Sequence, residues 1–288
     1  MARQTEDRSE IISQRNEREQ KLNAWRKRSP FSPYWIDWSL LRRSIEELPQ
    51  HANGWLLDLG CSEGPYRSMF EDRVERYIGL EYPPAILDKR PDLWDVLHIA
   101  RRTIEVFGDG TSLPFADASF DTVLATEVLE HLPAPQLAVA ESSRILRPNG
   151  KLLLTVPFCQ PLHELPGDYY RFTPGALEHM VREVGLIPVE IKPRGNFALA
   201  VGAVSAQFLS RWLATEVRLP DGSVKLSRWR NLLFMPLFAL VQVFCHLASK
   251  VTNDTTFCLG YTVVARKPGE AEAAQPESDP AAREPALS

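Results

Sequence analysis

Short apolar runs alternate with longer helical segments through the middle of the chain. The runs that predict strands are 55–59, 77–80, 104–107, 122–125, 152–156, 187–191 and 259–265. Their apolarity is continuous rather than alternating, which is typical of strands covered on both faces. The pattern therefore favours an α/β fold.

Helices are expected between these strands, for example over 136–146 and 173–184. Thr173 is a suitable N-cap for the second helix, and Pro174 fits its first turn. Strands that alternate with helices predict a mostly parallel sheet with right-handed crossovers and helices on both faces.

The two ends and one late block depart from this alternation. Residues 1–28 are expected to form a charged arm or helix. Residues 268–288 are rich in Pro, Ala and Glu, a composition that predicts a disordered tail. An apolar helical block, 195–254, precedes the last strand. We expect a core over 29–194, this insertion, and a return to the core over 255–267.

Composition narrows the classes of partner. The chain has 288 residues with 33 basic and 37 acidic side chains, and its net charge of -4 disfavours a nucleic-acid partner. The four cysteines lie far apart without a CxxC pair, and the first 28 residues do not resemble a secretory leader. We expect a cytoplasmic protein without structural zinc.

The segment LDLGCSEG, residues 57–64, places small residues where a strand turns into a helix. Gly60 and Gly64 let the backbone approach a ligand closely. The loop is not GxGxxG, and Glu63 at the helix start opposes a pyrophosphate, so NAD is disfavoured. Glu81 ends the second strand, where a carboxylate can accept both hydroxyls of a ribose.

An adenosine without phosphates fits these residues. Asp109, in the Gly-Asp-Gly turn after the third strand, is available to the adenine amino group, and Leu113 to the face of the ring. These strand ends are expected to line one crevice, the ligand site of an open α/β sheet.

The four motifs LDLGCSEG, GLE at 79–81, 108–132 and 144–158 together resemble class I S-adenosylmethionine-dependent methyltransferases of the type 11 group. The resemblance implies a Rossmann-like seven-stranded sheet and S-adenosyl-L-methionine as cofactor. Cys61 is expected to be a small side chain that fills the tight loop. The predicted cofactor-binding residues are Asp58, Gly60, Cys61, Ser62, Gly64, Glu81, Asp109, Gly110, Leu113 and Glu127.

Two loops offer candidates for the chemistry of transfer. His163, in the loop after the fifth strand, is the first candidate for the base that deprotonates a hydroxyl acceptor, because an imidazole titrates near neutrality. His131 is the second, and Tyr169 is a further catalytic candidate. No metal is expected, although Glu127, Glu130 and His131 resemble the metal-binding ExxEH of some O-methyltransferases and remain an alternative.

The apolar insertion suggests where the acceptor is found. Residues 231–249 carry no formal charge when His246 is neutral, but Pro236, Gln242 and His246 interrupt them. Arg194, Arg211, Arg228, Arg230 and Lys250 lie around the insertion. We expect 195–250 to associate peripherally with the inner membrane face, with a soluble lid or a dimer interface as the alternative.

The resulting functional hypothesis is methyl transfer, at oxygen, to a small glycan or lipid acceptor. The alternatives are a quinone-type O-methyltransferase and a non-catalytic protein that keeps the cofactor-binding fold.

Overall fold

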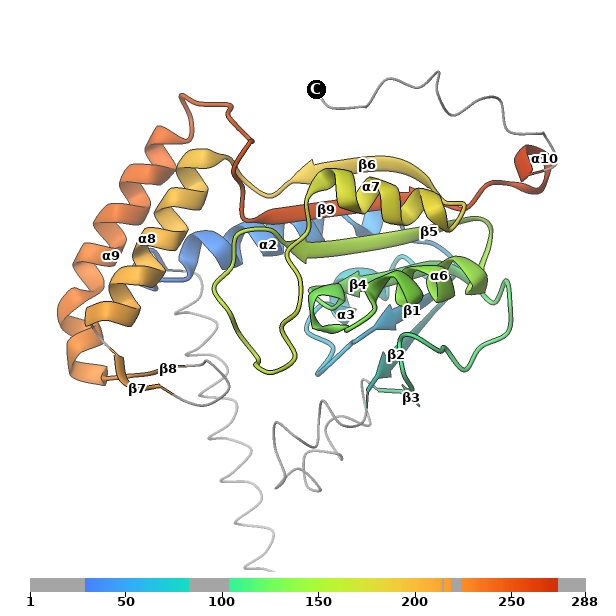
Figure 1. Ribbon diagram of the computed structural model, residues 1–288, viewed down its shortest axis with the longest axis horizontal. Coiled ribbons are helices and arrows are strands. Elements are labelled where there is room, and N and C mark those ends of the chain that lie inside the picture. The colour runs from blue at the N-terminus through green and yellow to red at the C-terminus, as the bar shows by residue number, and fades with distance from the viewer. Residues whose placement is uncertain (1–28, 83–103, 214, 219–223, 274–288) are drawn as a thin grey trace, which may run out of the picture.

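The computed structural model describes residues 29–82, 104–213, 215–218 and 224–273, and shows a single seven-stranded sheet flanked by helices (Figure 1). The strand order is β3-β2-β1-β4-β5-β9-β6. These strands are β1 Trp55–Leu59, β2 Arg76–Glu81, β3 Val106–Phe107, β4 Phe120–Thr126, β5 Leu146–Pro157, β6 Ile187–Pro193 and β9 Gly260–Arg266. Within the sheet, β9 alone runs antiparallel to its neighbours β5 and β6. The predicted fold class is confirmed.

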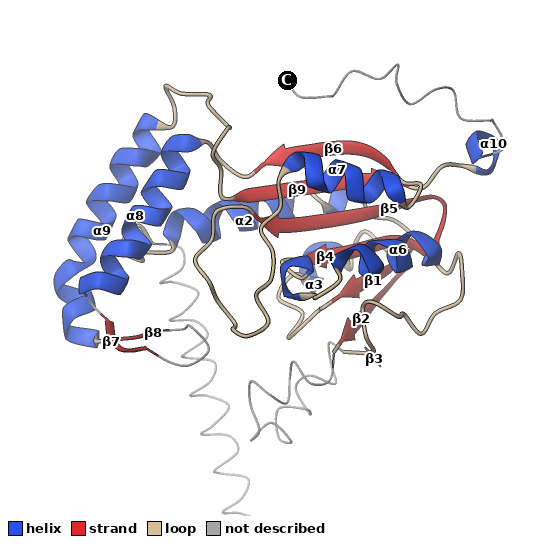
Figure 2. Ribbon diagram, viewed as in Figure 1, coloured by secondary structure: helices blue, strands red, loops and turns tan. Residues whose placement is uncertain are grey.

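Helices cover both faces of the sheet because successive strand residues point to opposite sides. On one face, Leu57, Val123 and Leu152 pack in a core with α6 Pro135–Ile145 and α7 Pro174–Glu183. On the other face, Leu56, Leu124 and Leu153 pack with α2 Trp35–Glu46 and α3 Arg67–Phe70. Figure 2 shows the two helix layers. The continuous apolarity of the strands is thus explained by burial on both sides.

The element boundaries follow local signals. Thr173 caps α7 as predicted, with its hydroxyl accepting from the backbone N–H of Ala176 at 3.3 Å. Two 3₁₀ turns, Pro49–His51 and Leu129–His131, complete the core. The predicted disorder from residue 268 is wrong for its first residues: α10 Glu270–Ala273 is a helical turn held by the Arg266–Glu272 ion pair at 2.6 Å. Residues 1–28 and 274–288 lie outside the described residues.

The apolar insertion is a pair of helices, α8 Phe197–Leu213 and α9 Arg228–Ala248, placed between β6 and β9. A short hairpin of β7 Thr215–Arg218 and β8 Val224–Leu226 connects them. The helices pack closely, since a Cβ on Gly202 would lie 2.6 Å from the Cβ of Cys245. Among the described residues, no helix combines the length and the apolarity that a bilayer crossing needs.

The polar residues that interrupt the insertion attach it to the core. Gln242 is fully buried; its Nε2 donates to the carbonyl of Ser32 at 2.7 Å, and its Oε1 accepts from the N–H of Ile36 at 3.2 Å. The ring of His246 lies 5.6 Å from that of Trp35. Trp35 and Trp38 both belong to apolar clusters around α2, so they pack rather than lie open to a ligand.

Candidate active site

The glycine loop after β1 folds over the end of β2. The N–H groups of Gly60 and Cys61 both donate to the carbonyl of Leu80, at 2.9 and 3.1 Å. Gly60 has φ +71°, and a Cβ there would lie 2.6 Å from Cγ2 of Val128. Gly64 has φ +63°. Glycine at both positions therefore permits a left-handed turn, and at Gly60 also a close approach to the loop after β4.

Glu81 occupies the centre of this edge. Its Oε2 accepts from the N–H of Ser62 at 2.6 Å, and its Oε1 accepts from the N–H of Tyr82 at 2.9 Å. Its backbone carbonyl accepts from the N–H of Gly108 at 3.1 Å, which brings the turn that carries Asp109 alongside. Gly60, Glu81 and Asp109 therefore lie at one edge of the sheet. Each Glu81 oxygen retains lone-pair capacity for a hydroxyl donor.

Asp58 lies at the end of β1, beneath the loop. The Tyr77 hydroxyl donates to its Oδ2. Burial raises the pKa of Asp58 to about 7, against the opposing effect of that hydrogen bond. Burial also raises the pKa of the neighbouring Cys61 thiol, so Cys61 is a space-filling side chain rather than a nucleophile.

The residues predicted to contact adenine differ in how exposed they are. Asp109 is exposed, and its Oδ1 accepts from the N–H and the hydroxyl of Thr111, at 2.8 and 2.7 Å. Gly110 is buried against Leu59. Leu113 belongs to the main core with 5% of its surface exposed, so it offers a ring little area. Its role beside adenine stays a prediction.

Glu127 forms an ion pair that the sequence did not reveal. Arg194 donates from Nη1 to its Oε1 at 2.7 Å and from Nη2 to its Oε2 at 3.3 Å. Arg194 directly precedes the apolar insertion in the sequence, but its guanidinium is buried behind the site. Burial alone lowers the pKa of Arg194, but Glu127 more than compensates, and the net shift is upward.

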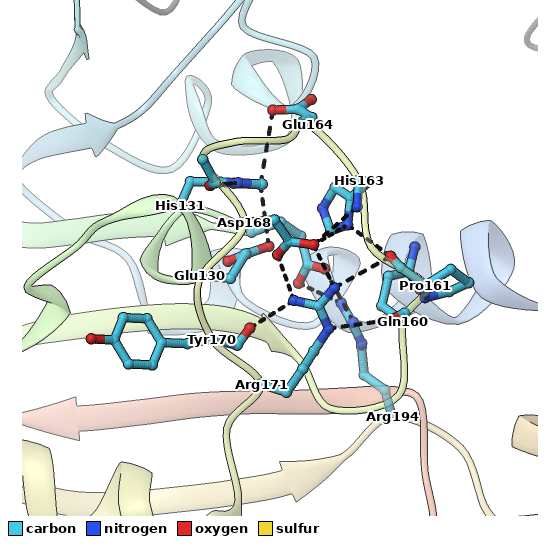
Figure 3. A network of polar contacts seen from close by, with 12 residues as sticks. Glu130, His131, Gln160, Pro161, His163, Glu164, Asp168, Tyr170, Arg171 and Arg194 are labelled. Carbon is cyan, nitrogen blue, oxygen red and sulfur yellow. Dashed lines mark hydrogen bonds and ion pairs between the residues drawn. The ribbon is translucent and has the colours of Figure 1, made fainter. Parts of the chain in front are cut away.

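A different set of side chains meets beside this pair (Figure 3). Glu130, His131 and His163 each offer a ligand atom, and these atoms lie within 4.8 Å of one another. Both Glu127 oxygens bind Arg194, and Glu127 is not one of these three residues. The alternative metal trio of Glu127, Glu130 and His131 stays a prediction. The residue that lies with Glu130 and His131 is His163, from the loop after β5.

Backbone contacts bring the two loops together. The carbonyl of Glu130 accepts from the N–H groups of Tyr169 and Tyr170, at 2.8 and 3.3 Å. The base of the second loop closes where the N–H of Phe172 donates to the carbonyl of Pro157 at 3.2 Å. The Tyr169 side chain is about half exposed, so its catalytic assignment stays a prediction.

An ion pair braces the loop after β5. Asp168 accepts from Nη1 and Nη2 of Arg171, at 2.6 and 2.8 Å, and from the N–H of His163 at 2.9 Å. Although burial raises the pKa of Asp168, these donors hold it at about 2. Arg171 also donates to the carbonyls of Gln160 and Pro161, so the loop has a defined shape.

These residues suit an adenosine that carries an amino acid. The Glu81 carboxylate can accept from the two ribose hydroxyls, and buried Asp58 is an acceptor for an ammonium group. The fold and this edge together define a Rossmann-like protein whose strand ends suit an adenosine-type cofactor.

Comparison with known proteins identifies the domain. Residues 57–154 match the family model described as a methyltransferase domain. This match bears out the predicted resemblance to type 11 methyltransferases over residues 57–154, for which S-adenosyl-L-methionine is the predicted cofactor.

Several relatives cover a similar part of the chain. An uncharacterized methyltransferase of Mycobacterium tuberculosis is 31% identical over 170 residues, which are 55% of this chain and 60% of the relative. The 27-O-demethylrifamycin SV methyltransferase of Amycolatopsis mediterranei is 31% identical over 166 residues, with 53% and 57% covered. Both matches therefore span less than two thirds of the relative's own length.

The chain also matches solved structures at low identity. The 1,6-didemethyltoxoflavin-N1-methyltransferase of Burkholderia thailandensis, solved with S-adenosylhomocysteine, is 19% identical with a TM-score of 0.46, covering 81% of this chain and 80% of its own. The fold assignment itself follows from the strand order described above.

Proposed function

We propose that the whole protein transfers a methyl group from S-adenosyl-L-methionine to a hydroxyl oxygen of a small glycan or lipid acceptor at a membrane surface. The observation that carries the proposal is the contact between the glycine loop and the loop after β4. Val128 packs on Gly60, and Glu130 and His131 follow directly. The chemistry-bearing cluster thus adjoins the cofactor edge.

The bound cofactor supplies a methyl group on a sulfonium, a leaving group that is already activated. The protein's task is then to align the acceptor oxygen with that methyl, and orientation is worth about 7–11 kcal/mol. The loop after β5 suits this task, because the Asp168–Arg171 pair holds its shape. No acyl intermediate or oxyanion hole is needed.

His163 is placed to receive the acceptor's proton. Its Nδ1 lies 3.1 Å from the carbonyl oxygen of Pro161. A carbonyl only accepts, so Nδ1 carries the hydrogen and Nε2 keeps its lone pair. His131 is arranged in the same way, with Nδ1 at 2.7 Å from the Gly167 carbonyl. Its pKa is lowered by burial, an effect that the Gly167 hydrogen bond opposes. Either imidazole can hold the proton at Nε2.

The outer surface of the helix pair supports a membrane-borne acceptor. Large apolar side chains there are exposed, with Trp212 at 71% and Trp229 at 83%. The others are Phe208, Leu232, Leu233, Leu240, Phe244 and Leu247. We call these eight residues the outer apolar face. A patch of this kind on a protein surface marks an interaction site.

The charges around the outer apolar face favour lipid headgroups over a second copy of the chain. Neither α8 nor α9 contains Asp or Glu, while Arg211 and exposed Arg230 lie beside the two tryptophans at one end of the pair. Tryptophan and basic side chains together suit an anionic membrane interface. Two copies facing each other would bring like charges together.

A quinol ring hydroxyl is the second candidate acceptor. Such an acceptor is also lipophilic. If methyl transfer requires a divalent ion, the cluster of Glu130, His131 and His163 favours a quinol over a glycan acceptor.

The test uses methyl-labelled cofactor with the purified protein and a cell extract divided into membrane-lipid and soluble fractions. Label is expected in the lipid-extractable material with the wild-type protein, and not with Glu81→Ala. His163→Ala should lower turnover with nearly unchanged cofactor affinity, whereas an equal loss of both would indicate a structural role. Label that enters only soluble protein or nucleic acid would refute the membrane acceptor, and no transfer to any fraction would favour a non-catalytic binding protein.

A further inference from the structure

We propose that Glu130, His131 and His163 form a binding site for one divalent transition-metal ion on the acceptor side of the active site. The inference rests on the proposed function only for what the ion does there. The three ligand atoms come from two loops, one after β4 and one after β5, and lie within 4.8 Å of one another. A single ion placed among them can reach all three.

The two imidazoles are already oriented as metal ligands. The Nδ1 atoms of His131 and His163 donate to the backbone carbonyls of Gly167 and Pro161, which leaves both Nε2 lone pairs available. The rings meet edge to face with centroids 5.0 Å apart. A metal-bound histidine typically donates its other ring N–H to a carbonyl or carboxylate in this manner, because that bond fixes tautomer and orientation.

Glu130 supplies an independent observation. Its side chain has 0% exposure, and neither carboxylate oxygen has a hydrogen-bond partner among the described residues. A buried carboxylate without a partner is costly. Nε2 of His131 lies 3.8 Å from its Oε1. A cation between these atoms would bind both and satisfy the carboxylate.

Two neighbouring carboxylates are paired with arginines, Glu127 with Arg194 and Asp168 with Arg171. A third, exposed Glu164, lies with its Oε2 3.9 Å from Nε2 of His131. The site therefore consists of one buried carboxylate and two neutral imidazoles, with Glu164 at its outer side. This donor set suits Zn²⁺, Fe²⁺, Co²⁺ or Mn²⁺ rather than Ca²⁺ or Mg²⁺, which prefer oxygen alone. Three protein ligands also leave a coordination position for an acceptor oxygen.

The ion changes how the acceptor loses its proton. A hydroxyl bound to a divalent ion has a lowered pKa, so its O–H bond can break with the proton passing to water. The oxygen then takes the methyl group as the sulfur–methyl bond breaks, which leaves S-adenosylhomocysteine. In the loaded protein His131 and His163 hold the ion; in the ion-free protein one of them accepts the proton directly.

The test is a titration of chelator-treated, full-length protein with Co²⁺, followed by its visible spectrum. The wild type is expected to bind one equivalent, without the near-ultraviolet charge-transfer band that a cysteine ligand would give. Glu130→Gln, His131→Ala and His163→Ala should each weaken binding at least tenfold. His179→Ala, on the exposed face of α7, is the control and should bind as the wild type does.

The outcomes separate this inference from the proposed function. If the wild type binds no stoichiometric Co²⁺, or if the three variants bind as tightly as the wild type, the metal site is refuted even when methyl transfer is intact. If Co²⁺ binds as predicted while no acceptor fraction is labelled, the site stands and the proposed function fails. Unchanged S-adenosylhomocysteine affinity in Glu130→Gln would show that the variant keeps its fold.

Discussion

Asp58 carries a buried carboxyl whose pKa burial raises to about 7, and this sets a pH dependence for cofactor binding. An ionised Asp58 attracts the ammonium group of the cofactor's amino-acid part, whereas a protonated one does not. We therefore expect affinity for S-adenosylhomocysteine to rise between pH 6 and 8, with proton release on binding. Calorimetry in buffers of different ionisation enthalpy measures both.

The Asp58→Asn variant is the control for this prediction and should bind with little pH dependence over the same range. An equal slope in both proteins would assign the effect to another group. The linked effect on stability has the opposite sign. Because the folded pKa lies above the unfolded value of about 3.9, Asp58 stabilises the fold fully below that value, and the contribution is lost as the pH rises through 7.

The Glu127–Arg194 pair is a second test at the scale of single residues. Removing one partner of a buried ion pair leaves an uncompensated charge, at a cost of about 3–5 kcal/mol. Arg194→Ala is therefore expected to lower the free energy of unfolding by that amount in urea denaturation. Arg182→Ala breaks an exposed pair with Glu178 and should cost less than about 1 kcal/mol. Equal effects would contradict the buried role.

At the scale of elements, the packing of α9 against the rest of the protein determines which side of the helix pair is exposed. Gln242 and His246 fix one side of α9 to the segment that carries the helix α2, and the side chains of the outer apolar face remain exposed. The polar residues that interrupt the apolar run thus attach a surface helix to the rest of the protein. This arrangement explains why an apolar insertion belongs to a chain that folds back into β9.

We expect the Trp212→Ser/Trp229→Ser double variant to lose at least tenfold in binding to vesicles that contain anionic lipid. Burial of one large apolar side chain is worth about 1.5–3 kcal/mol, and 1.4 kcal/mol is tenfold in affinity. Sedimentation with sucrose-loaded vesicles measures the loss. Trp55→Ser is the matched control, since Trp55 is part-exposed at the start of β1. The proposal would be contradicted if the wild-type protein did not bind vesicles but formed a dimer that the double substitution dissociates.

Most elements of the fold were predictable because their signals are local. All seven strands of the main sheet appear where apolar runs predicted them, and the Thr173 cap was correct. The strand order and the antiparallel β9 follow from long-range pairing, which no local pattern encodes. The β7–β8 hairpin was missed because it has weak periodicity, and the helix α2 was not predicted.

At the scale of the whole molecule, the cofactor edge was predictable and the acceptor side was not. Gly60, Glu81 and Asp109 follow consecutive strands, so their meeting is a consequence of parallel strand order. By contrast, Arg194 reaches Glu127 across 67 positions of sequence, and His163 joins His131 only because Glu130 accepts from Tyr169 and Tyr170. Such contacts depend on the path of loops, and no spacing rule describes them.

The central claim is that one edge of the sheet binds the adenosine part of the cofactor through Glu81. Isothermal titration of the purified protein with S-adenosylhomocysteine tests it most directly. One molecule should bind per chain, and Glu81→Ala should weaken binding at least tenfold, because hydrogen bonds to a charged group contribute about 1.5–3 kcal/mol. Glu183→Ala, exposed on α7, should bind as the wild type does. Absent binding, or equal affinity in Glu81→Ala and the wild type, would contradict the account.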